Sequence, residues 1–193
     1  MVDLSNPQPQ IPAQTLSLHA LSVGEGILAL CQAPGLGGNY KEDLRLIREW
    51  RPSIVITLTT RVEHVIMGVE TLGTDIQSLG SRWFHFPVDD YQIPTADSQD
   101  RWREISTLAR KALAGGGRVL VHCKGGCGRS GMTALRLLID SGEAPDAALA
   151  RLRSVRPCAV ETDAQMAWAY GPRRKAPSAN AAVPLAEAPR TAS

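Results

Sequence analysis

An α/β fold, in which helices flank a central and largely parallel sheet, is the expectation for this chain. Segments with strand-like and helix-like patterns alternate along its middle, and residues 53–59 form a β-branched run suited to a buried strand. The chain has 193 residues, of which 44% are hydrophobic and 21% charged. Such a chain is long enough for one domain with a sizeable core.

The first half of the domain is expected to hold three strands and two helices. The strands are those at 16–18, 27–31 and 53–59. A helix over Tyr40–Trp50 is indicated by apolar residues at helical spacing, and Pro52 ends it. The next helix is indicated by a single apolar stripe, made of Val62, Val65, Ile66, Val69 and Leu72.

The second half begins with an alternating strand over Arg82–Phe86, which Pro87 stops. A long helix over Ser98–Leu113 follows, and the three glycines after Ala114 break it. A strand over Arg118–His122 comes next. Three further helices are expected over about 129–141, 146–155 and 162–170.

Both ends of the chain are predicted to be flexible, which leaves residues 15–171 as the domain. Residues 1–14 are rich in Pro, Gln and Ser, and residues 172–193 hold little that could pack. The run Arg173–Lys175 in the tail could contact a partner or could simply be solvated.

Charge and composition narrow the classes of function. The chain has 21 Lys and Arg against 19 Asp and Glu, a net charge of +2 that gives no support to nucleic-acid binding. The longest apolar runs are too short to span a bilayer, and the N-terminus lacks the pattern of a secretory signal. A cytoplasmic location is therefore expected, with no membrane and no nucleic acid among the partners.

The four cysteines are predicted to be reduced rather than to form a disulfide framework. They lie at positions 31, 123, 127 and 158, which is few and scattered. His122, Cys123 and Cys127 make one cluster, but no second cluster completes a four-ligand metal site. No metal is expected.

The segment from Val119 to Gly131 is an apolar strand, a glycine-rich loop and an apolar helix. Ligands of open α/β sheets bind at such a place, beyond the carboxyl end of a strand. The glycines allow successive backbone N–H groups to point inward, and the following helix adds the positive end of its dipole. The loop is predicted to bind a phosphate-sized dianion.

Cys123 stands at the start of this loop. Backbone N–H donors and a helix N-terminus favour its thiolate, which is a strong nucleophile at neutral pH. Arg129 can hold two phosphate oxygens with its planar fork. Ser130 places a hydroxyl near the thiolate, where it could help the cysteine leave. His122 is expected to be buried and to order the loop rather than act as a base.

The pattern His-Cys-x5-Arg-Ser, carried by His122, Cys123, Arg129 and Ser130, resembles the signature of the cysteine-dependent protein tyrosine phosphatase superfamily. The resemblance covers about residues 25–170. It implies a tyrosine-phosphatase-like fold, a cysteinyl-phosphate intermediate on Cys123, charge stabilisation by Arg129 and the loop, and no organic cofactor.

The segment His85–Pro94 resembles the acid loop of dual-specificity phosphatases, especially of the kinase-associated, Cdc14-like and regenerating-liver branch. The leaving oxygen needs a proton, so a carboxylic acid is expected on a loop beside the nucleophile. In the family pattern the acid stands three residues after the proline, which selects Asp90 as acid and later as base on water. Asp89 is its rival, and either could be a plain turn residue.

Residues 156–165 resemble the family segment that follows the loop-bearing helices, whose glutamine orients the hydrolytic water. This role falls on Gln165. The same residues could instead cap a helix, with Thr162 as the cap and Gln165 at the position three residues on.

The chain departs from common family members at Cys127 and Cys158, where a non-thiol residue and Gly are more usual. Cys127 could trap an oxidised Cys123 as a reversible disulfide, or it could be a passive loop residue. Lys124 either adds charge at the rim of the pocket or faces solvent. Related lipid-directed phosphatases carry a second Lys at the position of Cys127, and its absence argues against polyphosphoinositides.

The sequence thus predicts a phosphatase of the dual-specificity type, acting on phosphotyrosine of proteins, with phosphoserine and phosphothreonine as further candidate substrates. The residues expected to bind the substrate phosphate are Lys124, Gly125, Gly126, Cys127, Gly128 and Arg129. Three alternatives stay open: a phosphatase of a small-molecule or inositol phosphate, a non-catalytic phosphoprotein-binding module, and an arsenate reductase or sulfurtransferase with the same loop. Oligomeric state is not predicted.

Overall fold

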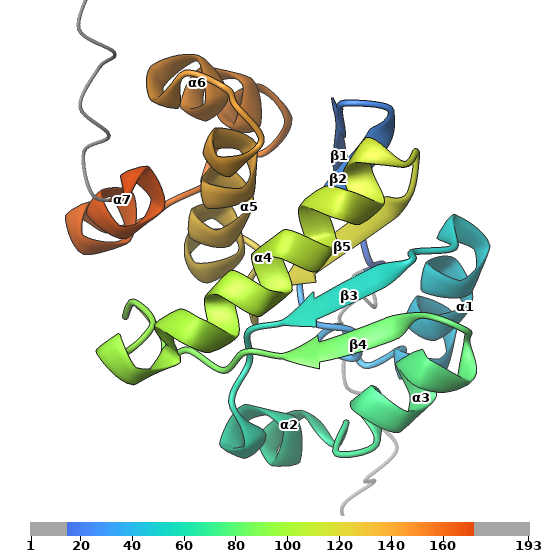
Figure 1. Cartoon of the computed structure of the whole chain (residues 1–193). Helices are drawn as coiled ribbons and strands as arrows, with labels where there is room; N and C mark the ends of the chain where they lie inside the picture. The colour runs from blue at the N-terminus through green and yellow to red at the C-terminus, as the bar shows by residue number, and fades with distance from the viewer. Residues whose placement is uncertain (1–14, 172–193) are drawn as a thin grey trace, which may run out of the picture.

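The computed structural model describes residues 15–171, which form a five-stranded sheet with helices on both faces (Figure 1). The strand order is β1-β2-β5-β3-β4. Only β1 and β2 pair antiparallel, and the other neighbours are parallel. The strands are β1 (His19–Val23), β2 (Gly26–Cys31), β3 (Ile54–Thr57), β4 (Arg82–His85) and β5 (Arg118–His122). The predicted α/β fold with a largely parallel sheet is confirmed.

Helices cover the sheet unequally. One face packs against α1 and α3, and the other against α4, α5 and the helices beyond them (Figure 1). The helices are α1 (Tyr40–Trp50), α2 (Arg61–Met67), α3 (Leu72–Ser78), α4 (Gln99–Ala114), α5 (Gly128–Asp140), α6 (Pro145–Val155) and α7 (Asp163–Tyr170). A short 3₁₀ turn, η1 (Ala96–Ser98), leads into α4.

The core has two parts because successive strand residues point to opposite faces of the sheet. In β2, for example, Leu28 and Leu30 join the core under α4 and α5, whereas Ala29 and Cys31 join the core under α1 and α3. Most of α5 is buried, since it packs against β2, β5 and three other helices. The start of α5, where the glycine-rich loop ends, is therefore firmly held.

Two sequence predictions of elements are wrong in detail. The first strand lies at His19–Val23 rather than at 16–18, because the turn that pairs Val23 with Gly26 sets its register. The apolar stripe is not one helix. Gly68 ends α2 in a left-handed conformation at φ +66°, which glycine adopts without strain, and α3 begins only at Leu72.

The split of this helix changes which of its apolar residues are buried. Val69 and Leu72 lie in the core at 1% and 0% exposure, whereas Val62, Val65 and Ile66 are 68%, 62% and 73% exposed. A periodic pattern shows which residues share a face, but not whether that face meets the core.

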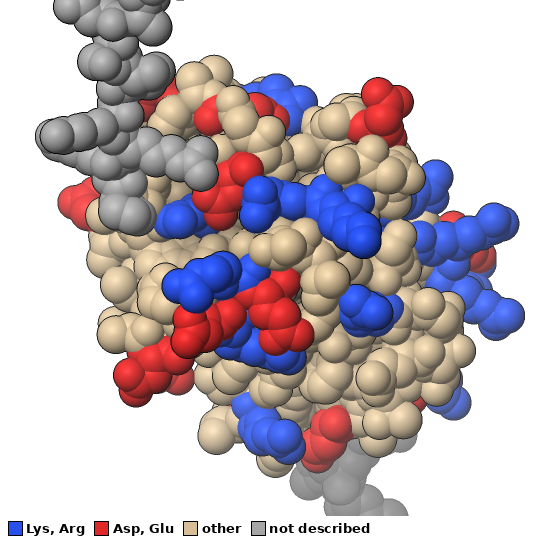
Figure 2. Space-filling view, in the orientation of Figure 1, with Lys and Arg blue, Asp and Glu red and all other residues tan. Residues whose placement is uncertain are grey.

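The predicted flexible segments, 1–14 and 172–193 with Arg173–Lys175, lie outside the described residues. Within residues 15–171, every helix is too short or too polar to cross a membrane. Basic and acidic side chains lie next to one another on the face that carries α4 (Figure 2), where Arg101 pairs with Glu104 and Arg103 with Asp100. The charge on that face is therefore mixed rather than of one sign.

Candidate active site

The glycine-rich loop lies between the end of β5 and the start of α5. Because β5 is the middle strand, the loop stands at the carboxyl edge of the sheet, between β2 and β3. Three of the predicted residues come together here and are buried: Cys123, Arg129 and Ser130 are 2%, 1% and 0% exposed.

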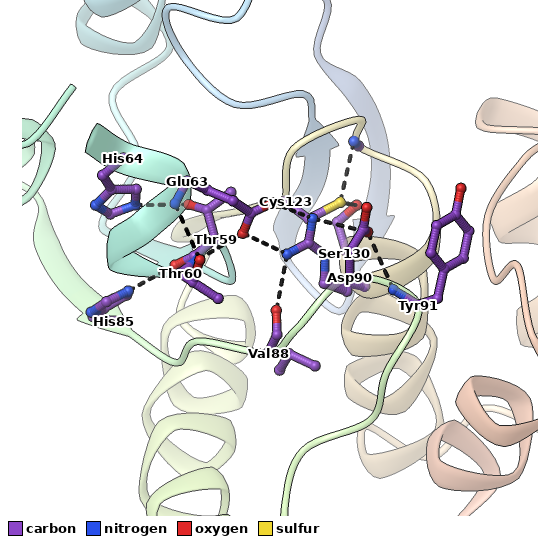
Figure 3. Close-up of polar contacts among 12 residues, drawn as sticks. Thr59, Thr60, Glu63, His64, His85, Val88, Asp90, Tyr91, Cys123 and Ser130 are labelled. Atoms are coloured by element: carbon purple, nitrogen blue, oxygen red, sulfur yellow. Dashed lines mark hydrogen bonds and ion pairs between the residues drawn. The ribbon is translucent and has the colours of Figure 1, made fainter. Parts of the chain in front are cut away.

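The sulfur of Cys123 has two polar neighbours. The backbone N–H of Gly126 donates to Sγ at 3.2 Å, and the Ser130 hydroxyl lies 3.3 Å from it (Figure 3). Gly126 has a φ of +71° and lies so close to the backbone of Cys31 that a Cβ would stand 2.5 Å from the Cys31 carbonyl carbon. Only glycine fits there, and this conformation turns the Gly126 N–H toward the sulfur.

His122 is fully buried and anchors the end of β5. Its Nε2 lies 2.7 Å from the Thr57 hydroxyl, which also accepts a hydrogen bond from the Trp83 indole at 2.8 Å. Burial, together with the nearby His64, lowers the pKa of His122 to about 3. The ring is therefore neutral at physiological pH and can accept the Thr57 hydroxyl proton. This agrees with an ordering role and not with a role as base.

The guanidinium of Arg129 is held by three groups from outside the loop. Glu63 accepts two parallel hydrogen bonds at 2.8 Å each, and the Val88 carbonyl accepts one at 2.9 Å. The Asp90 carboxylate lies 3.1 Å from Nη2. In Figure 3 the Glu63 and Asp90 carboxylates and the Val88 carbonyl point toward the guanidinium group that lies between them. Within the described residues Nε has no hydrogen-bond partner, so it remains free to donate to a bound anion.

Charges around Arg129 and Glu63 reinforce each other. Burial opposes the charge of Arg129, but the hydrogen bond to Glu63 and the charges of Cys123, Glu63 and Asp90 raise its pKa overall. Burial likewise opposes the charge of Glu63, yet Arg129 and the backbone N–H of Thr60 lower its pKa overall. Both groups are therefore ionised at neutral pH.

Glu63 was missed in the sequence, although it carried a local signal. Thr60 and Glu63 form a capping box at the start of α2: Thr60 Oγ1 accepts from the Glu63 N–H at 3.2 Å, and Glu63 Oε2 accepts from the Thr60 N–H at 2.8 Å. The pattern Thr-x-x-Glu directly after β3 predicts this cap. Nothing local predicts that the same carboxylate also binds Arg129.

The acid loop brings Asp90, and not Asp89, to the site. Asp90 lines the same pocket as Cys123, although its side chain is 55% exposed. Tyr91, beside it, is 57% exposed and has a φ of +59°, an uncommon conformation for a bulky residue. Uncommon backbone conformations of this kind cluster at functional sites.

The pocket has a volume of about 310 Å³, with Cys123 among its lining residues. Lys124 lines the pocket, as the interpretation that places its charge at the rim predicts. The lining residues are Leu36, Asp90, Tyr91, Cys123, Lys124, Gly125, Cys127, Gly128 and Glu161. Leu36, Tyr91 and Glu161 were not predicted as site residues.

Gln165 lies behind the loop rather than among the residues that line the pocket. It is fully buried, and its Oε1 accepts a hydrogen bond from the Glu161 N–H at 3.0 Å. The backbone N–H of Gln165 donates to Thr162 Oγ1 at 3.2 Å. Thr162 therefore caps α7, as the helix-capping interpretation of this segment predicts. The Gln165 amide and the Glu161 carboxylate both lie against Gly128.

The predictions for Cys127 and for the redox state of the cysteines are contradicted. Cys127 forms a disulfide with Cys158, so it is neither passive nor paired with Cys123. Cys31 and Cys123 are the free thiols of residues 15–171. The two bonded residues are 31 positions apart, and α5 and α6 return the chain to the loop between them. Sequence spacing alone does not reveal this approach.

Arg156 is a further contact that the sequence did not predict. It donates from Nε to the Gly126 carbonyl at 3.0 Å and from Nη2 to the Gly125 carbonyl at 2.9 Å. Among residues 15–171, no group of three or more His, Cys, Asp or Glu is arranged to hold a metal ion.

A buried cysteine in an anion-binding loop, next to an ionised arginine and facing an exposed aspartate, is the arrangement of the cysteine-based phosphatases. Comparison with protein families is more specific. The family model described as "Polymorphic toxin system, DSP-PTPase phosphatase" matches residues 30–143, which is more than half of the chain. The chain belongs to this family of dual-specificity protein tyrosine phosphatases.

Known relatives agree with this assignment. Cyclin-dependent kinase inhibitor 3 of mouse is 30% identical over 135 residues, a match that covers 67% of this chain but only 63%, less than two thirds, of the mouse protein. The rat protein of the same name is 30% identical over 167 residues, covering 80% of this chain and 77% of that protein. The predicted resemblance to the kinase-associated branch is confirmed.

A solved structure supports the same fold. The crystal structure of kinase associated phosphatase, with its catalytic-site cysteine replaced by serine, superposes with a TM-score of 0.72 at 25% identity. The match covers 81% of this chain and 93% of that one. The tyrosine-phosphatase fold predicted from the sequence is thereby confirmed.

Proposed function

We propose that this chain hydrolyses phosphate monoesters through a cysteinyl-phosphate intermediate, with phosphotyrosine and also phosphoserine and phosphothreonine of proteins as substrates. The observation that carries this proposal is the setting of Cys123. Its sulfur accepts a backbone N–H in the same pocket that holds Asp90, and Arg129 beside it has one donor, Nε, without a partner within residues 15–171. Family membership supports the same chemistry.

In the first step a phosphate dianion enters the loop and takes the place that the Asp90 carboxylate now holds beside Arg129. Nη2 and the free Nε of Arg129 then hold two phosphate oxygens, while Glu63 keeps the guanidinium plane fixed. The Cys123 thiolate attacks phosphorus in line with the leaving oxygen. Loop N–H groups and Arg129 stabilise the charge on the three equatorial oxygens.

Asp90 supplies the proton for the leaving oxygen. Once the phosphate displaces its carboxylate from Arg129, Asp90 takes a proton from solvent and stands at the mouth of the pocket as the neutral acid, next to the leaving group. Its 55% exposure leaves room for that movement. Protonation lets the alcohol or phenol leave as a neutral molecule.

Hydrolysis of the cysteinyl phosphate reverses these roles. Asp90, now a carboxylate, takes a proton from the attacking water, and the Ser130 hydroxyl, 3.3 Å from Sγ, stabilises the departing thiolate. We propose that Gln165 orients this water: the Glu161 N–H holds its Oε1, and within residues 15–171 its Nε2 has no hydrogen-bond partner.

The substrate class is argued from the rim of the pocket. Leu36 and Tyr91 are exposed apolar side chains beside Cys123, and the ring of Tyr91 offers a face for an aromatic leaving group. This favours phosphotyrosine over phosphothreonine. Among residues 15–171, Lys124 is the one basic residue that lines the pocket, which agrees with a single phosphate group rather than a polyphosphate.

We also propose that residues 15–171 form the phosphatase domain and that the protein is cytoplasmic. The Cys127–Cys158 disulfide bears on this location, because cytosolic reductants keep most such bonds open. Fractionation of the expressing cells, with mapping of this bond in each fraction, tests the location.

Hydrolysis of p-nitrophenyl phosphate in the presence of EDTA tests the activity, with the parent, Cys123→Ser and Asp90→Ala compared side by side. Turnover by the parent that disappears in Cys123→Ser and falls strongly in Asp90→Ala supports the mechanism. A folded parent without turnover would favour a phosphoprotein-binding module. Turnover that is the same in the parent and in Asp90→Ala would favour arsenate reductase or sulfurtransferase chemistry. Phosphotyrosine and phosphothreonine peptides and inositol phosphates, at matched concentration, then rank the substrates.

A further inference from the structure

The outer side of the phosphate loop is braced by one short segment, residues 156–160. Arg156 donates to the Gly125 carbonyl at 2.9 Å and to the Gly126 carbonyl at 3.0 Å. The Val160 N–H lies 3.4 Å from the Cys127 carbonyl. Cys158, between them, is bonded covalently to Cys127. Three successive residues of the loop are thus tied to this segment.

This bracing bears directly on anion binding, because the C=O and N–H of a trans peptide point in opposite directions. Where Arg156 holds the Gly125 carbonyl outward, the N–H of the same peptide points into the pocket. That N–H belongs to Gly126 and is the one that donates to Cys123 Sγ at 3.2 Å. Arg156 holds the next peptide, which carries the Cys127 N–H, in the same way.

The disulfide joins the loop to the brace beside these two peptides. Cys127 is the residue before the first turn of α5, and Cys158 follows Arg156 by two positions. The bond therefore limits how far residues 156–160 can separate from the loop. It is also open to reductants, since Cys158 is exposed and Cys127 half-buried, whereas the free thiols Cys31 and Cys123 are 0% and 2% exposed.

We propose that the Cys127–Cys158 disulfide is a positioning element of the phosphate loop, and that opening it weakens the binding of phosphate. This inference rests on the proposed function only in taking the loop as the phosphate site. A dithiol reductant opens the bond by supplying two electrons. The S–S bond breaks, each sulfur ends as a thiol, and the reductant becomes a cyclic disulfide.

The nucleophile and the disulfide then need opposite redox states. Cys123 must be reduced to act as a nucleophile, whereas Cys127 and Cys158 must be oxidised to hold the loop around it. Activity should therefore pass through a maximum as the surroundings become more reducing. A strong thiol reductant, which protects the nucleophile, would at the same time loosen its phosphate site.

The test measures the dissociation constant of inorganic phosphate by calorimetry on the full-length Cys123→Ser variant. In this variant the Cys127–Cys158 bond is the group that dithiothreitol reduces, because the remaining cysteine, Cys31, is already a free thiol. Mass spectrometry of the alkylated protein reports whether the bond is closed or open, and circular dichroism reports the fold. The matched control is the triple variant Cys123→Ser, Cys127→Ser, Cys158→Ser.

Reduction is expected to raise the dissociation constant about three- to tenfold, since Arg156 still holds the loop but less firmly. The triple variant should bind as weakly as the reduced protein and should not respond to dithiothreitol. In the parent, the KM for p-nitrophenyl phosphate should rise with the dissociation constant. An effect on stability alone would move neither quantity at temperatures where the protein stays folded.

Three results would overturn the inference. The oxidised protein could contain no Cys127–Cys158 bond, phosphate could fail to bind the oxidised protein, or the dissociation constant could stay the same after mass spectrometry shows the bond open. The proposed function fails separately. A parent that turns over nothing while its phosphate affinity responds to reduction leaves the inference intact, and a parent that turns over normally without that response refutes the inference alone.

Discussion

The phosphate loop and the acid loop face each other across one pocket, yet they are built in opposite ways. Cys123, Arg129 and Ser130 are at most 2% exposed, and the loop between them is fixed by Arg156, a disulfide and the close approach of Cys31. By contrast, the side chain of Asp90 is 55% exposed, and its carboxylate is held by the neighbouring Tyr91 N–H and by Arg129, the arginine that would bind the substrate phosphate.

This difference follows from the chemistry that each loop performs. Charge on the transferring phosphoryl group is stabilised best by dipoles that need not reorganise, so the donors around Cys123 must be fixed before the substrate arrives. The acid must follow a leaving group that differs from substrate to substrate and must then turn to water. A rigid loop suits the first task, and a loosely held one suits the second.

The largest effect is expected at the rigid loop. Replacing the nucleophile, Cys123→Ser, should lower kcat for p-nitrophenyl phosphate by about 10⁴-fold or more, because the covalent route is lost while the phosphate site remains. Steady-state kinetics and phosphate calorimetry measure the two properties separately. The other free thiol, Cys31, provides the control, and Cys31→Ala should keep activity within a few-fold. If Cys123→Ser retained turnover, the nucleophile would have to be sought elsewhere.

A smaller effect is expected at the acid loop. Asp90→Asn should lower kcat for phenyl phosphate, a poor leaving group, by about 10²–10³-fold, because the departing oxygen lacks a proton donor. Stability should hardly change, since Asp90 is exposed. Asp89→Asn, one position away and outside the pocket, is the matched control and should stay near the parent. Equal losses in both variants would mean that the loop matters and the acid does not.

Replacement of Glu63 should show how strongly catalysis depends on the fixed position of the Arg129 guanidinium. Glu63→Gln should lower kcat/KM by about 10–100-fold through misplacement of the guanidinium. It should also lower the free energy of unfolding by about 3 kcal/mol, because a buried charge loses its partner. Kinetics and urea unfolding check the two parts. Glu42→Gln breaks an exposed ion pair with Arg45 and should change neither. A fully active Glu63→Gln would contradict the view that Arg129 must be held.

The smallest expected effect is on the pH dependence of stability. It concerns His122, which anchors the strand before the loop. Its pKa of about 3 in the folded chain lies below the ordinary value of 6.5. As pH falls from about 6.5 toward 3, the unfolded state binds a proton that the folded state does not, so stability falls by up to about 1.4 kcal/mol per pH unit. His122→Asn should flatten this part of the curve.

Urea unfolding between about pH 7 and pH 4 measures that slope. His64, whose pKa burial also lowers, keeps its own share of the acid sensitivity in both proteins. The comparison is therefore between two slopes. Identical slopes in the parent and His122→Asn would show that His122 does not carry the proton linkage.

The sequence predicted best what is contiguous in the chain. Cys123, Arg129 and Ser130 lie within eight residues between a strand and a helix, so their meeting depends only on local structure. Helix periodicity likewise predicted α1, α4 and α5 closely. It failed after β3, where Gly68 divides the apolar stripe into two helices.

The sequence could not predict contacts that depend on how distant elements return to the loop. Glu63 comes from α2, and Arg156 and Cys158 lie beyond α6. The residue types gave hints, a Thr-x-x-Glu cap and two cysteines at unusual positions. Without the strand order β2-β5-β3, however, nothing shows which of these side chains reaches Cys123 or Arg129.

Direct capture of the phosphorylated enzyme tests the central claim, that the rigid phosphate loop carries the phosphoryl group on Cys123 and that the exposed Asp90 supplies the proton transfers. Asp90→Asn should release p-nitrophenol from p-nitrophenyl phosphate in a stoichiometric burst, since this leaving group needs little help, and should then turn over slowly. Rapid quenching and peptide mapping should find the phosphoryl group on Cys123. Turnover without a burst, or a phosphoryl group on another residue, would contradict the account.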